Sequence, residues 1–254
     1  MNGHVVMMVA ALMLSTLTTV AGESWVLFGS ARGFTTGCDP SYIWATETIF
    51  HNTAASDRQI GILHHSGTTI LPPSITVAGG ESRSLFFGNI PPSGLEALKI
   101  DVPSDVIVES RLQYWNVQPC VGLPPPLGPS GKIGLLSFHL TDAGQPQHHY
   151  GLDLGIEPVR VNVGVYNAGT STATATIELR RPKCNNPVTA VLTVPPDTLV
   201  QVRVPIPPIC DVSANDAPFW IVNGTVTVDQ PSFSYATSVS NVQAPHVTFG
   251  VGTP

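Results

Sequence analysis

The sequence predicts an all-β protein of antiparallel strands, and three observations support this fold class. The chain has 24 prolines and 23 glycines in 254 residues, and both residue types are unfavourable inside helices. Residues 159–180, VRVNVGVYNAGTSTATATIELR, alternate apolar and polar side chains on both sides of a turn. A weaker copy lies at residues 46–64. Successive strand side chains point to opposite faces, so we expect each strand to bury one face and expose the other to solvent.

The same alternation justifies the remaining strands in chain order. The valines at 159, 161, 163 and 165 lie on one face of the first strand. After the turn at 167–171, the apolar residues at 173, 175, 177 and 179 lie on one face of the second strand. Residues that favour turns lie on either side of each of the other strand-like runs. These runs are residues 25–28, 44–50, 58–64, 75–77, 82–87, 95–102 and 106–114, followed by 199–204, 220–228 and 233–239.

Strand-like runs recur at corresponding positions in the two halves of the chain. Asn167 corresponds to Asn52, and the matched positions are roughly 115–125 residues apart, about one sandwich domain plus its linker. Residues 119–131 are rich in proline, which lacks a ladder donor, so this segment cannot form a central strand. We therefore expect two β-sandwich domains, at residues 23–140 and 141–254.

Residues 1–22 are expected to form a signal peptide. The apolar run at 5–14 is too short to span a bilayer, and small residues follow at 19–21. The segment lacks lysine and arginine, which leaves a buried N-terminal helix as the alternative. No later apolar run has the length of an anchor. We expect a secreted or periplasmic protein without stable membrane insertion after cleavage.

Charge and cysteine content limit the possible partners and cofactors. Charged residues are only 11% of the chain and form no basic run, so nucleic acid is not expected as a partner. The four cysteines, Cys38, Cys120, Cys184 and Cys210, predict two disulfides with three possible connectivities. Pairing within each half, Cys38–Cys120 and Cys184–Cys210, is the simplest. The cysteines show no CxxC spacing, the pattern that would indicate a zinc site. No cofactor is expected.

Three stretches, VGVYNAG at 163–169, FSYATSVSN at 233–241 and VESR at 108–111, carry a family resemblance. The chain resembles the tandem immunoglobulin-like β-sandwich repeats of exported bacterial proteins, over most of residues 24–254. The resemblance implies two antiparallel immunoglobulin-like sandwiches and an accessory or binding role. The four cysteines and the proline-rich loop depart from the family pattern.

The candidate metal and catalytic residues all have simpler structural interpretations. The histidine pairs at 64–65 and 148–149 cannot each chelate one ion, because neighbours on a strand face opposite ways. A site would need one histidine from each pair plus His51 or His139. The glycines and the serine at 29–33 do not have the spacing of the nucleophile elbow of serine hydrolases. No catalytic or metal-binding residue is predicted.

Three further polar residues have both a functional and a structural interpretation. Asp101 and Asp105 flank a turn and could bind calcium, although turn aspartates more often hydrogen-bond nearby backbone. Asn223 begins a glycosylation sequon inside a strand-like run, where a bulge or turn is the better interpretation.

The predicted function is an exported, non-catalytic module that binds an unknown protein or polysaccharide, or supports a surface. The aromatics Trp25, Trp44, Tyr114 and Trp115 could stack on sugars, although most are expected in the core or in contacts between the domains. The first binding region to consider is the loops at 34–41 and 119–131, which the Cys38–Cys120 bond would hold together. Its candidate ligand contacts are Trp115, Leu123 and Pro125. The alternative function is a secreted hydrolase with its site at the inter-domain loops.

Overall fold

The computed structural model confirms the all-β class. It describes residues 22–33, 41–66, 71–87, 94–117, 131–135, 140–153, 159–182, 184, 186–208, 221–240, 246–249 and 251–253. These residues form seventeen strands and no helix, so no described segment is a helix that could cross a membrane. The predicted signal peptide, apart from Gly22, lies outside the described residues.

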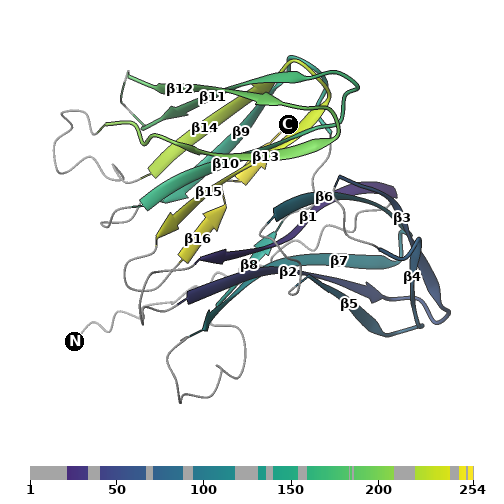
Figure 1. The fold of residues 1–254 in the computed structure, drawn as a ribbon. Helices are drawn as coiled ribbons and strands as arrows, with labels where there is room; N and C mark the ends of the chain where they lie inside the picture. The colour runs from purple at the N-terminus through teal and green to yellow at the C-terminus, as the bar shows by residue number, and fades with distance from the viewer. Residues whose placement is uncertain are drawn as a thin grey trace, which may run out of the picture.

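The first half of the chain forms one antiparallel sheet that folds into two layers (Figure 1). One layer has the order β4-β3-β6-β1 and the other β5-β2-β7-β8, and the end of β1 pairs with the start of β2. Apolar side chains from both layers, including Phe50, Ile60, Leu98 and Ile100, form the core between them. The strands are β1 (Gly22–Gly33), β2 (Ser41–Asn52), β3 (Arg58–His65), β4 (Ser74–Val77), β5 (Ser82–Phe87), β6 (Gly94–Val102), β7 (Val106–Val117) and β8 (Gly131–Leu135).

The second half forms two separate antiparallel sheets that pack face to face. Their orders are β13-β10-β15-β16 and β12-β11-β14-β9-β17. Val161, Val163 and Val165 on β10 pack with Ile177 and Leu179 on β11 in the core between the sheets. The strands are β9 (Pro146–Asp153), β10 (Val159–Asn167), β11 (Ala173–Arg180), β12 (Val188–Val194), β13 (Thr198–Val204), β14 (Ile221–Val228), β15 (Ser232–Ser240), β16 (His246–Phe249) and β17 (Val251–Thr253).

The two halves share their strand pairings. β2 pairs with β5 and β7 as β10 pairs with β13 and β15. The registers also correspond, because Asn52 lies opposite Val106 and Asn167 lies opposite Ser232. Asn52 and Asn167 therefore occupy the same place at the end of equivalent strands, as the sequence predicts.

These two asparagines fix equivalent turns. The buried Asn167 donates from Nδ2 to the carbonyl oxygens of Ser171, Val194 and Pro195 at 2.8, 3.0 and 3.2 Å. Its Oδ1 accepts the Gly169 amide at 2.9 Å. These bonds tie the turn after β10 to the end of β12 and the residue that follows it. Asn52 makes the same four bonds in the first half, with Ser56, Val77, Ala78 and Ala54.

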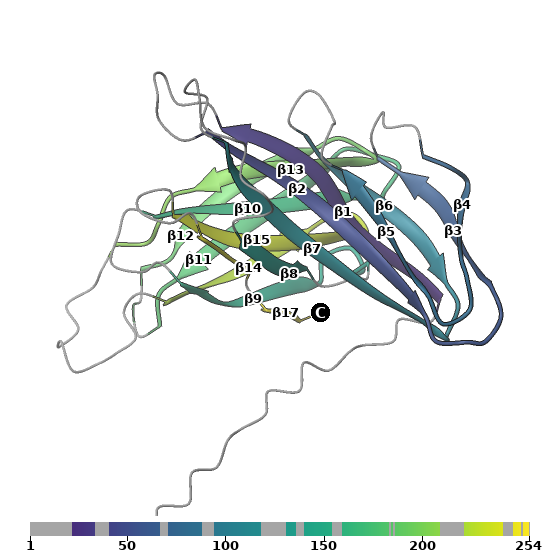
Figure 2. The ribbon, with the colours of Figure 1, turned by 90° about the horizontal axis from the view of Figure 1, so that it is seen from below.

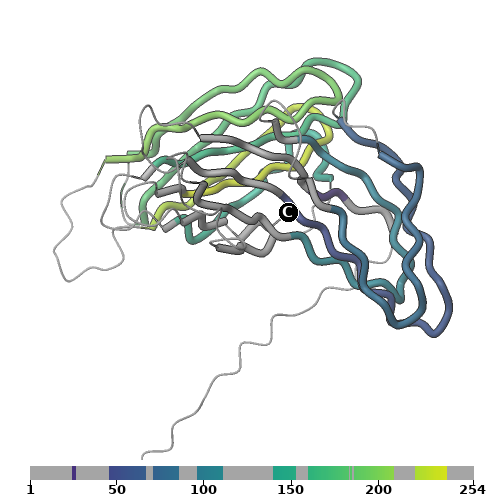
Figure 3. The backbone as a smooth tube through the Cα atoms, turned by 60° about the horizontal axis from the view of Figure 1, so that its bottom comes forward, coloured from purple at the N-terminus to yellow at the C-terminus, as the bar shows by residue number. Residues whose placement is uncertain are grey.

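One expectation about β10 is wrong. The sequence predicts that its non-valine face is polar and solvent-exposed, yet Asn162 and Tyr166 on that face are buried. β1 and β6 of the first half cover this face, and Figure 2 shows β1 running across β10 and β13. The four-stranded sheet is therefore covered on both sides. Figure 3 follows the chain from the first half, in purple to teal, into the second, in green to yellow.

Candidate functional site

The first candidate site is the junction between the halves, which is built around Trp25. The Trp25 ring lies 4.6 Å from the Tyr166 ring and 6.0 Å from the Phe233 ring, measured between centroids. Only 6% of Trp25 is exposed. Trp25 is therefore a packing residue and cannot stack on a sugar, because β1 presses it against the second half.

Asp197 connects the halves at the rim of this aromatic cluster. It follows β12 at φ 51°, a left-handed conformation that is uncommon outside glycine. Its Oδ1 lies 2.6 Å from Nε2 of His64 and accepts the Tyr166 hydroxyl at 2.8 Å. Burial, followed by the bond to Asp197, raises the pKa of Tyr166, which therefore stays a neutral donor. Gly80, with φ 72°, lies at the equivalent turn of the first half.

A buried polar chain inside the second half includes a serine–histidine contact. Nε2 of His149 lies 2.8 Å from Oγ of Ser234. The Ser234 hydroxyl donates to Oε1 of Gln147 at 2.9 Å, and Nε2 of Gln147 lies 3.0 Å from Ser232. Because the Ser234 proton is directed at Gln147, His149 must donate from Nε2 and carries its proton there.

The protonation of His149 follows from its surroundings. Burial first, and then the charge of His148, lower its pKa to about 4. Only 2% of the residue is exposed. The contact with Ser234 therefore joins β9 to β15 with a neutral imidazole, and it cannot deprotonate Ser234 for attack on a substrate.

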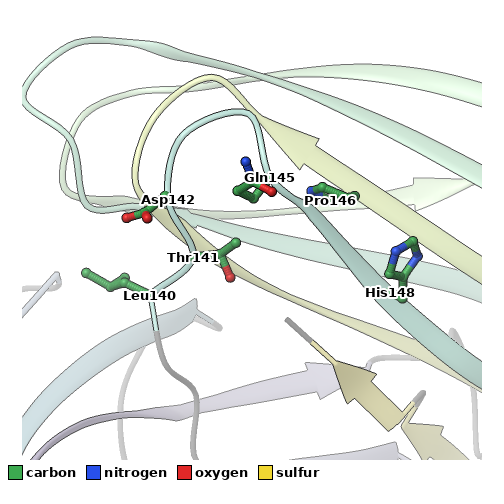
Figure 4. A pocket seen from close by; sticks show the side chains of 6 residues that line it. All are labelled: Leu140, Thr141, Asp142, Gln145, Pro146 and His148. Atoms are coloured by element: carbon green, nitrogen blue, oxygen red, sulfur yellow. The ribbon is translucent and has the colours of Figure 1, made fainter.

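The second candidate site is an open pocket of about 390 Å³ beside β9 (Figure 4). It is lined by Leu140, Thr141, Asp142, Gln145, Pro146 and His148. Asp142 and Gln145 close a turn through the bond from Gln145 N to Asp142 O at 3.1 Å. Gly144 adopts φ 79° at the third position of this turn, which a type II turn requires.

Hydrogen bonds to the second half hold this pocket wall in place. Thr141 N donates to Ser232 O at 2.7 Å and Ser232 N donates back to Thr141 O at 3.1 Å. Gly144 N donates to Val228 O at 2.7 Å. The backbone that presents the pocket side chains is thus tied at two points to β14 and β15.

Two aromatic rings extend from the pocket along β9. His148 and Tyr150 point to the same face of the strand, and their rings stack with centroids 6.0 Å apart and planes 22° apart. His148 Nδ1 lies 3.2 Å from the Thr225 hydroxyl, which orients the imidazole. Tyr150 is 45% exposed. The pocket thus opens beside a flat aromatic surface.

The histidines that the structure describes do not gather into a metal site. Within the described residues, no group of three His, Cys, Asp or Glu side chains could hold an ion. His64 binds Asp197, His51 lies 2.9 Å from the Ser82 hydroxyl, and His148 lies beside Thr225. His139 lies outside the described residues.

Two of the polar residues with alternative interpretations, Asp105 and Asn223, have partners in the structure. Asp105 accepts the Arg58 guanidinium at 2.7 and 2.9 Å, and this hydrogen-bonded ion pair lowers the pKa of the carboxyl group. The Asp105 carboxylate is thus committed to Arg58, a partner that the sequence analysis did not consider. At Asn223 the β9–β14 pairing shifts register, which confirms the predicted bulge. The Asn223 side chain accepts the Gly151 amide at 3.2 Å.

The predicted disulfide and ligand-contact residues lie largely outside the described part of the chain. Cys184 is buried and disulfide-bonded, whereas Cys38, Cys120 and Cys210 lie outside, so both pairings stay predictions. The backbone of Trp115 lies on β7 opposite Ile43. Leu123 and Pro125 fall outside the described residues, as do the loops that carry them.

The pocket beside β9 could not be recognised in the sequence. Its only local signal is the DAGQ turn at 142–145, and nothing in that turn indicates that its side chains share a cavity with His148. Comparison with protein-family models, curated proteins and solved structures finds no match to this chain.

Proposed function

We propose that this chain is an exported, non-catalytic module of two tandem immunoglobulin-like β-sandwiches. It binds an unknown protein or polysaccharide, or supports a surface, at the cell exterior or in the periplasm. The matched strand registers and the two equivalent asparagine turns support the tandem arrangement. The low charge supports an uncharged ligand or a protein partner over nucleic acid.

The junction between the halves supports a role as a rigid unit. Trp25 and Ala97 from the first half pack with Tyr166, Phe233 and Tyr235 from the second in one buried cluster. Aromatic packing of this kind contributes beyond the area that it buries. A rigid pair of sandwiches can hold a binding surface at a fixed orientation without ordering cost.

The observation that carries the non-catalytic proposal is the direction of the hydrogen bond at Ser234. The Ser234 hydroxyl donates to Gln147 and is closed to solvent. It therefore lacks both the base and the access that a nucleophilic serine requires. The other described histidine contacts orient side chains against hydroxyl or carboxylate partners on the protein.

One observation favours the alternative, a hydrolase with its site at the inter-domain loops. His64 and Asp197 lie 2.6 Å apart at the junction and are both partly exposed. A histidine oriented by a carboxylate forms two members of a catalytic triad. Among the described residues, no serine, threonine or cysteine side chain bonds to His64, so the nucleophile is missing from this part of the chain.

The test is an activity screen on the purified mature protein, together with pull-downs on polysaccharides and surface proteins. We expect binding and no hydrolysis of ester, peptide or glycan substrates. A variant without residues 123–129 tests the proline-rich loop as the binding site. Turnover by the wild type that His64→Ala abolishes would replace the binding role with the hydrolase alternative.

A further inference from the structure

We propose that the pocket beside β9 binds a neutral carbohydrate, with one sugar ring against the His148–Tyr150 surface. This inference rests on the proposed binding function and names its ligand class and site. The carrying observation is the meeting of an open polar pocket with a stacked, exposed aromatic pair on one strand. Such a combination of apolar surface with a few placed polar groups is typical of small-ligand sites.

The polar side chains match the chemistry of sugar hydroxyls. The Thr141 hydroxyl and the Gln145 amide both donate and accept hydrogen bonds, whereas the Asp142 carboxylate accepts only. Within the part of the chain that the structure describes, the Asp142 and Gln145 side chains have no hydrogen-bond or ion-pair partner. They are exposed at the pocket and remain available to a ligand.

The apolar groups supply a surface for the C–H face of a sugar ring. Tyr150 is 45% exposed and its ring is nearly parallel to that of His148. Leu140 is 42% exposed and, with Pro146, adds apolar contact on the pocket wall. An aromatic ring with a polar end suits a ligand that is apolar on its faces and polar at its edge.

Charge and strand pairing argue against two other ligand classes. No lysine or arginine occurs among the described lining residues, Asp142 is acidic, and the chain carries a net charge of −6. An anionic ligand would therefore be repelled. A peptide cannot add to β9 as an extra strand, because β14 and β17 already pair with its two edges.

The backbone of the site is ordered before any ligand arrives. The pocket wall is tied to β15 through Thr141 and to β14 through Gly144. A frame that is already fixed loses little entropy on binding. Shallow contact with a sugar can therefore give measurable affinity without rearrangement of the protein.

The test is titration of the full mature chain with neutral oligosaccharides built from glucose, xylose, mannose or N-acetylglucosamine, followed by calorimetry. We expect at least one to bind, and Asp142→Ala and Tyr150→Ala each to weaken it by about tenfold. Tyr150→Phe keeps the ring and should bind as the wild type does. Val191→Ala, at an exposed position on the far edge strand β12, is the matched control. Unchanged melting temperatures show that the variants are folded.

Three outcomes would overturn the inference: no binding to any neutral probe, unchanged binding by both alanine variants, or tighter binding to polygalacturonate than to the neutral sugars. None of these outcomes touches the non-catalytic proposal, which only turnover would defeat. If pull-downs recover a protein partner while no sugar binds, the proposed binding function stands and the proposed carbohydrate site is rejected.

Discussion

Replacing Asn167 with aspartate tests whether a single amide holds the turn between β10 and β11. The substitution preserves shape and keeps the acceptor for the Gly169 amide. It removes the Nδ2 donor and sets an oxygen against the carbonyl groups of Ser171, Val194 and Pro195. Because Asn167 is fully buried, water cannot replace the lost bonds.

The expected loss can be worked from these contacts. The two Nδ2 hydrogens contribute about 2 kcal/mol, at about 1 kcal/mol for each bond. The new side-chain oxygen, which is buried and faces carbonyl oxygens without a donor, adds about 2 kcal/mol. We therefore expect Asn167→Asp to lower the free energy of unfolding by about 4 kcal/mol, a large part of the 5–15 kcal/mol typical of a domain. Asn167→Ala removes the same donor without the oxygen–oxygen repulsion and should cost less.

Urea unfolding measures this free energy directly. Asn52→Asp should cause a similar loss, because Asn52 makes the same four bonds in the first half. Thr176→Ala, at an exposed position on β11, is the control and should change stability by less than about 0.5 kcal/mol. An Asn167→Asp protein within about 1 kcal/mol of the wild type would refute the reasoning that the turn depends on this donor.

Three other perturbations have expected outcomes. Gly164→Ala would place a methyl group in the buried Tyr235 ring, and we expect a loss of about 1–3 kcal/mol in urea unfolding; wild-type stability would contradict this packing. Asp197→Ala removes the bond to His64 across the junction and the bond to Tyr166 within the second half, so backbone amides near Tyr166 should exchange hydrogen faster than in the wild type. Unchanged exchange would count against the role of Asp197 at the junction. The pKa of His149 is lowered from 6.5 to about 4 by burial, so the unfolded state binds the extra proton first as pH falls. His149 therefore contributes stability that is fully present above about pH 6.5 and is lost, by up to about 3 kcal/mol, as pH falls toward 4. A pH series of urea unfolding in which His149→Gln has the same slope as the wild type would disprove this.

The strand pattern could be predicted because alternation is a local property. Val161, Val163 and Val165 face a core on β10, and Ala173 and Ile177 do so on β11, as the two-residue period requires. The correspondence of Asn52 with Asn167 was also visible from the turn that follows each. The bulge at Asn223 followed from an Asn-Gly pair inside a strand.

The burial of the second face of β10 could not be predicted in this way. This face has the composition of an exposed surface, because it carries Arg160, Asn162, Gly164 and Tyr166. Only the docking of β1 and β6 shows that Trp25 covers it. The pairing of β10 with β15 explains Gly164, because the Tyr235 ring on β15 lies across it and leaves no room for a side chain.

The sequence by itself therefore determined the all-β class, the positions of most strands along the chain and the core face of β10 and β11. The protonation of His149, the partner of Asp105 and the pocket beside β9 were decided only by the tertiary structure. Each depends on residues distant along the chain, such as Gln147 with Ser234 and Thr141 with Ser232. Periodicity is set by the backbone of one strand, whereas burial, hydrogen-bond direction and cavity shape are set by whichever strands meet it.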